Sequence, residues 1–133
     1  MEASGATPAL DRSASNAGTD ANADGVRDDV EKYVASLTDT PAQKKALLML
    51  SKAMNTALAA SPTDQTALRA ATDQMNNSVA CIWKNYPPEI ADQKVLEVRK
   101  VTINTRGRYD TYMKYNAAVA GTVVKLPREV NCG

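Results

Sequence analysis

Residues 40–64 read TPAQKKALLMLSKAMNTALAASPTD, and this stretch decides the fold class. Thr40 can cap a helix, Pro41 suits its first position, and Gln43 stands three residues after the cap, as in a capping box. Beyond the cap, apolar side chains recur at a helical spacing of three and four residues; they are Leu47, Leu50, Met54 and Leu58. The stretch therefore predicts an amphipathic helix that ends near Ala60.

The flanking segments repeat the helical pattern. Ser61-Pro62-Thr63-Asp64 has the same capping residues and predicts a second long helix that ends before Pro87-Pro88. Residues 28–37 predict a short amphipathic helix. Residues 89–120 are also helical in pattern, but Gly107 and the strand-prone residues 101–103 leave open whether they form one helix or two, with a break near 105–108. We therefore expect an all-α fold, a small single-domain bundle of about four helices.

The composition excludes several classes of function. The chain has 133 residues, no His, and 16 basic against 15 acidic residues, for a net charge of +1. A near-neutral chain is not expected to bind nucleic acid through its overall charge. Without His, the commonest general acid–base and the base of Ser–His and Cys–His pairs are missing, so we expect no enzymatic activity. The longest apolar run, residues 46–50, is far shorter than the roughly 20 residues of a membrane span.

The two cysteines, Cys81 and Cys132, lack the spacing of a redox or metal-binding motif. We expect a disulfide between them that clamps the C-terminal tail to the body; the alternative is two unrelated thiols. Disulfides persist in oxidising compartments, which favours a periplasmic or secreted protein. Residues 1–19 read as a flexible leader without a signal peptide. We therefore expect either that an export signal has been removed or that the protein is cytoplasmic.

Residues 20–31 carry the most specific motif of the chain. They read DANADGVRDDVE and match the pattern D-x-[DN]-x-[DN]-G-x5-E without a gap. A hard cation takes six to eight oxygen ligands, and alternate Asp and Asn side chains on a tightly curved loop can supply them. Gly25 permits the sharp turn that such a loop needs. The alternative is a polar segment in which Asp28 and Asp29 only favour a helix N-terminus.

This motif resembles the calcium loop of the EF-hand family. The resemblance implies one Ca²⁺ ion held by Asp20, Asn22, Asp24, the Val26 carbonyl, Asp28 and Glu31. It covers only residues 20–31 and the helix after them, because residues 8–19 do not read as an incoming helix and no second loop is present. The match is therefore closer to the loop–helix units of dockerin-type proteins than to a paired calcium sensor. We expect residues 20–133 to form a single helical domain that opens with this loop.

Basic residues gather in the C-terminal part of the chain. Residues 94–128 hold eight basic and two acidic side chains, a local charge of +6. We expect a partner-binding surface there formed by Arg99, Lys100, Arg106 and Arg108. The partner would be an acidic protein surface or an anionic component of the cell envelope. The alternative is an ordinary solvated helix face.

Together these features predict a non-enzymatic, exported, calcium-binding helical protein that acts through contacts with another protein or with the cell envelope. An alternative function is that of a periplasmic immunity or inhibitor protein that blocks a toxin or an enzyme. Small size, a helical fold and a disulfide suit that alternative, but no particular residue points to it.

Overall fold

The computed structural model describes residues 26–120 and Cys132, and within them all regular structure is helical. The helices are α1 (Asp28–Ala35), α2 (Pro41–Ala59), α3 (Gln65–Asn85), α4 (Pro88–Thr102) and α5 (Arg106–Val119). The all-α prediction is confirmed, with five helices in this part of the chain where the sequence predicted about four. The predicted leader, residues 1–19, lies outside the described residues.

The caps of α2 and α3 explain where these helices begin. The predicted capping box of α2 is confirmed, because Thr40 Oγ1 accepts from the Gln43 backbone N–H at 3.2 Å and Gln43 Oε1 accepts from the Thr40 N–H at 2.9 Å. In α3, Asp64 caps the helix by accepting from the Ala67 N–H at 3.1 Å. The helix therefore begins at Gln65, directly after the predicted capping segment 61–64.

Residues 89–120 form two helices. α4 ends at Thr102, within the β-branched run of residues 101–103, which has low helix propensity, and residues 103–105 form a corner between α4 and α5. Thr105 Oγ1 caps α5 by accepting from the Arg108 N–H at 3.1 Å. Gly107 lies inside the first turn of α5, so the glycine that predicted a break does not itself form the corner.

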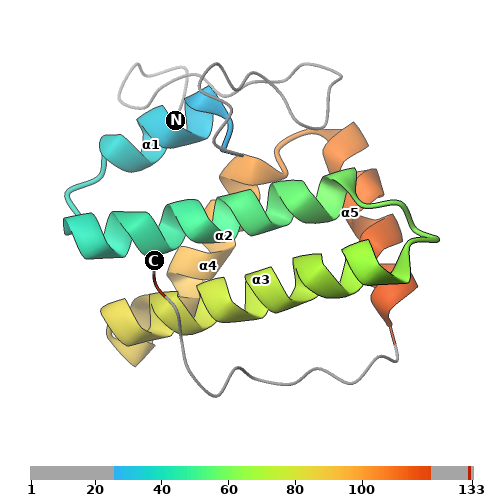
Figure 1. The fold of residues 1–133 in the computed structure, drawn as a ribbon. Coiled ribbons are helices and arrows are strands. Elements are labelled where there is room, and N and C mark those ends of the chain that lie inside the picture. The colour runs from blue at the N-terminus through green and yellow to red at the C-terminus, as the bar shows by residue number, and fades with distance from the viewer. Residues whose placement is uncertain (1–25, 121–131, 133) are drawn as a thin grey trace.

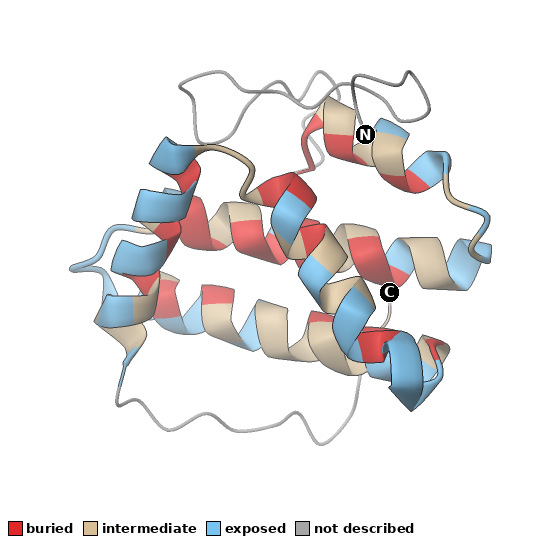
Figure 2. Ribbon diagram, turned by 180° about the vertical axis from the view of Figure 1, so that it is seen from behind, coloured by how far each residue is buried: buried red, intermediate tan, exposed pale blue. Residues whose placement is uncertain are grey.

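The central pair consists of α2 and α3, which lie side by side and run antiparallel (Figure 1). α4 crosses behind this pair and packs against both helices. α5 stands across one end of the pair, and α1 lies against α2 near the other end. Seen from behind, the buried residues of α4 face the central pair, and its outer side is exposed (Figure 2).

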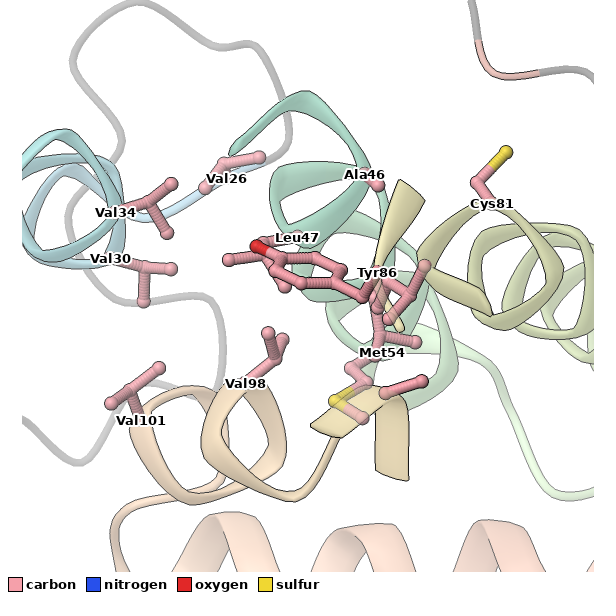
Figure 3. Packing of buried hydrophobic residues seen from close by; sticks show 13 residues of the cluster. Val26, Val30, Val34, Ala46, Leu47, Met54, Cys81, Tyr86, Val98 and Val101 are labelled. Atoms are coloured by element: carbon pink, nitrogen blue, oxygen red, sulfur yellow. The ribbon is translucent and has the colours of Figure 1, made fainter. Parts of the chain in front are cut away.

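Two apolar clusters fill the interior. The larger one takes residues from α1, α2, α3 and α4. Val26, Val30 and Val34 belong to residues 26–35, called here the α1 segment, and point towards Leu47 and Val98 (Figure 3). The smaller one joins α2, α3 and α5 and contains Ala57, Leu58, Leu68, Ala71, Tyr112 and Tyr115. Because α1 contributes to the larger cluster only through one face, its other side is left to carry polar groups.

The predicted disulfide between Cys81 and Cys132 is confirmed, with Cα atoms 5.6 Å apart. Cys81 is fully buried on α3, so the bond holds residue 132 against the larger core cluster. The remainder of the tail, residues 121–131 and 133, lies outside the described residues. Among the helices given above, none is both long and apolar enough to cross a membrane.

Candidate metal centre

The second half of the predicted calcium loop lies at the start of α1. Val26, Asp28 and Glu31 are described there, and Val26 is buried in the larger core cluster. The loop therefore joins the body of the protein at a fixed point, immediately before the helix. The other three predicted ligands lie outside the described residues; they are Asp20, Asn22 and Asp24.

Arg27, at the eighth position of the loop, points into the protein and is 0% exposed. Its Nε and Nη2 donate to the two carboxylate oxygens of Asp29, at 2.8 and 2.7 Å. Nη2 also donates to the Val101 carbonyl at 2.8 Å, and Nη1 donates to the Thr102 carbonyl at 2.8 Å and to Asn104 Oδ1 at 3.0 Å. All five N–H donors of a guanidinium are used in this way, and the buried charge has a carboxylate partner.

The acidic residues of the first turn of α1 divide between two sides of the helix. At 100° per residue, Asp28 and Glu31 lie about 60° apart, whereas Asp29 and Glu31 lie about 160° apart. Asp29 faces Arg27 and neutralises its charge. Asp28 and Glu31 are half-buried on the other side, with Glu31 Oε1 buried. The two predicted ligands of this turn therefore share a side of the helix that the Arg27 guanidinium does not occupy.

Asp28 and Glu31 are side chains of the kind that a hard cation takes as ligands. Carboxylates near a helix N-terminus are stabilised by the helix dipole, and calcium prefers carboxylate and backbone carbonyl oxygens. Within residues 26–120 there is no group of three or more His, Cys, Asp or Glu side chains that could hold a metal ion. A calcium site at α1 therefore needs the ligands predicted at residues 20–24 together with Asp28 and Glu31.

A second polar cluster joins the loop before α2 to α4 and to the end of α3. Tyr86 Oη donates to Asp39 Oδ2, and Lys94 Nζ lies 3.0 Å from the same oxygen and 5.4 Å from the centre of the Tyr86 ring. Burial alone would raise the pKa of Asp39, but the hydrogen bonds from Tyr86 and Lys94 outweigh it and lower that pKa. Burial and the hydrogen bond to Asp39 raise the pKa of Tyr86. Asp39 therefore stays ionised and Tyr86 protonated near neutral pH, which suits a structural tie better than proton transfer.

The basic residues predicted to meet a partner differ in how far they are exposed. Arg106 is 91% exposed and pairs with Asp110 at 3.8 Å, and Lys100 is also exposed. Arg99 is half-buried, with its guanidinium carbon 5.3 Å from the centre of the Tyr112 ring. Arg106 and Lys100 are therefore open to an anionic partner, and Arg99 is partly engaged inside the protein.

Arg108 corrects the predicted surface. It is 1% exposed, and its Nη1 donates to Asn104 Oδ1 at 2.7 Å. A buried guanidinium cannot meet a partner at the surface, so the prediction of a contact role for Arg108 is wrong. Its position in the first turn of α5 directs the side chain towards the corner between α4 and α5.

Two exposed apolar residues accompany the basic residues of α5 and were not among the predicted contacts. Tyr109 is 49% exposed and Met113 is 41% exposed, and they stand one helical turn apart. Tyr112 and Tyr115, on the inner side of the same helix, are buried. The signal for the exposed pair is in the sequence, because apolar residues occur on both sides of α5.

Comparison of the chain with protein-family profiles, with curated proteins and with solved structures gave no match.

Proposed function

We propose that the protein binds one calcium ion through the loop that leads into α1, and that it acts without enzymatic activity, by contact with an anionic partner. The ion would be held by Asp28 and Glu31 from α1 and by the Val26 carbonyl. The remaining ligands would be Asp20, Asn22 and Asp24.

The position of Arg27 carries this proposal. A cation among the loop residues would oppose a bound metal by charge repulsion, and Arg27 is the one basic residue of the motif. Its guanidinium is buried and paired with Asp29, away from the side of α1 that Asp28 and Glu31 share. Arg27 at this loop position therefore contributes to the fold, and Asp29 neutralises its charge.

The disulfide supports an oxidising compartment, periplasmic or extracellular, because such bonds form and persist there. Calcium in those compartments is plentiful enough to fill a single site with a dissociation constant of about 10⁻⁴ to 10⁻³ M, as in other extracellular modules. The two features favour the same location.

The calcium site is tested by isothermal titration of the full chain. Glu31→Gln removes charge from the ligand expected to give two oxygens and should weaken binding by at least about tenfold. Glu89→Gln is the matched control, since Glu89 also lies in the first turn of a helix and is exposed. Absence of calcium binding by the wild-type chain at millimolar concentration would contradict the proposal, as would equal effects of the two substitutions.

The contact surface is proposed to include Lys100, Arg106 and the exposed pair Tyr109 and Met113. Polyglutamate is a suitable probe of an acidic protein surface, and polyphosphate is a suitable probe of an anionic polymer. The double change Lys100→Glu and Arg106→Glu should weaken binding of the probe and its dependence on salt, because exposed charges act through screened attraction. Lys84→Glu, on the exposed side of α3, is the control. Equal binding by the double variant and the wild type would show that these bases are an ordinary solvated face.

A further inference from the structure

The Arg27 guanidinium acts as a C-cap for a helix more than seventy residues away. It donates to the carbonyls of Val101 and Thr102, the last two residues of α4. The last four carbonyls of a helix have no partner within that helix, and they carry the negative end of its dipole. The buried Arg27 guanidinium donates hydrogen bonds to two of these carbonyls, and its positive charge lies at the negative end of the dipole. Both effects stabilise the end of α4.

The same contact reaches α5 through Asn104. Asn104 Oδ1 accepts from Arg27 Nη1 at 3.0 Å and from Arg108 Nη1 at 2.7 Å. Arg108 lies in the first turn of α5, and both guanidiniums are almost fully buried. The corner between α4 and α5 is thus held between one arginine from the α1 segment and one from α5.

The α1 segment is the element of the fold best suited to dock and undock as a unit. α1 has eight residues, and isolated helices shorter than about 12–15 residues are marginal in water. Its stability therefore depends on the burial of Val26, Val30 and Val34 and on the hydrogen bonds of Arg27. Short elements held by few contacts open locally more readily than the core of a domain.

We infer that the α1 segment is a calcium-responsive latch on the corner between α4 and α5. The calcium part of this inference rests on the proposed function; the mechanical link rests on the hydrogen bonds of Arg27. An ion bound by the Val26 carbonyl, Asp28 and Glu31 would hold the backbone on both sides of Arg27 and would favour the docked segment. At a free concentration one hundred times its dissociation constant, an ion that binds only the docked state shifts the docking equilibrium about a hundredfold. Docking in turn holds the corner from which the exposed face of α5 projects.

Hydrogen exchange of the full chain, with and without calcium, tests the latch. In the wild type, calcium should slow amide exchange in residues 99–108 as well as in residues 26–35. Arg27→Gln should speed exchange in residues 99–108 of the metal-free protein and should abolish the effect of calcium there, while residues 26–35 still respond. Arg69→Gln, on the exposed side of α3, is the matched control and should behave as the wild type.

A second variant, at Asn104, tests the same link from the corner between α4 and α5. It keeps the inference testable if the Arg27→Gln variant does not fold. Asn104→Ala removes the acceptor shared by the two arginines, and by thermodynamic reciprocity it should lower calcium affinity about fivefold or more. Asn116→Ala, further along α5, should leave the affinity unchanged. The latch would be overturned if residues 99–108 of the Arg27→Gln variant exchanged at the same rate as in the wild type. It would also be overturned if Asn104→Ala left the calcium affinity unchanged. If the wild type binds no calcium, the proposed site and the calcium response are both wrong. Hydrogen exchange of the metal-free Arg27→Gln variant and of the metal-free wild type still tests whether Arg27 stabilises residues 99–108.

Discussion

Removal of the disulfide is the perturbation whose size follows most directly from the structure. Cys81 and Cys132 are 51 residues apart in the chain, so the bond closes a loop of about that length in the unfolded protein. The loop-closure entropy for this length corresponds to about 4 kcal/mol at 25 °C. Small domains have a total stability of about 5–15 kcal/mol, so Cys132→Ala should remove a large part of it. Cys81 keeps its place in the core, where a free cysteine packs as a small apolar residue.

Urea unfolding, followed by far-UV circular dichroism and by the fluorescence of Trp83, measures this loss. With an m-value near 2 kcal/mol per M, the midpoint should fall by about 2 M. A reducing agent should lower the midpoint of the wild type to that of Cys132→Ala and should leave the variant unchanged. A loss of less than about 1 kcal/mol would refute the reasoning, since the bond would then not restrain the unfolded chain as the loop length requires.

Three further predictions concern the core, a cap and a titrating group. Leu50→Ala, in the larger core cluster, should lower the free energy of unfolding in urea by about 3 kcal/mol, and Leu96→Ala, on the exposed side of α4, by less than about 0.5 kcal/mol; equal losses would contradict the packing. Thr40→Ala should cost about 1 kcal/mol in the same assay through loss of the capping box, and no measurable loss would contradict that role. Because the folded-state pKa of Asp39 is lowered, the stability that it contributes is present above its ordinary value of 3.8 and is lost as the pH falls through the folded-state value. Asp39→Asn should therefore reduce the slope of stability against pH below about pH 4, and an unchanged slope would contradict the assignment.

Local signals in the sequence were enough to predict most of the helices. The capping box of Thr40 and Gln43 involves residues three apart, and the apolar stripes of α2 and α3 repeat at the helical period. Ser61 and Asp64 are both capping residues in the segment before α3, and the sequence alone did not decide between them; Asp64 makes the cap hydrogen bond. The disulfide could be predicted because the chain has only two cysteines.

The roles of Arg27 and Arg108 could not be predicted, because their partners are distant in the chain. The acceptors of Arg27 include the backbone carbonyls of Val101 and Thr102, at the end of α4. Any residue type has such a carbonyl, so the sequence carries no sign of the contact. Arg108 was grouped with its basic neighbours, but the corner at residues 103–105 and Asn104 turn it inward. Burial of a charge is set by tertiary contacts, and composition alone favours the surface.

A crystal structure of the full chain grown with calcium tests the central claim most directly. We expect one ion at the N-terminal side of α1, bound by six to eight oxygens at about 2.3–2.6 Å. Asp28 and Glu31 should be among the ligands, and Arg27 should remain buried against Asp29. A structure grown in millimolar calcium in which no ion contacts Asp28 or Glu31 would contradict the account.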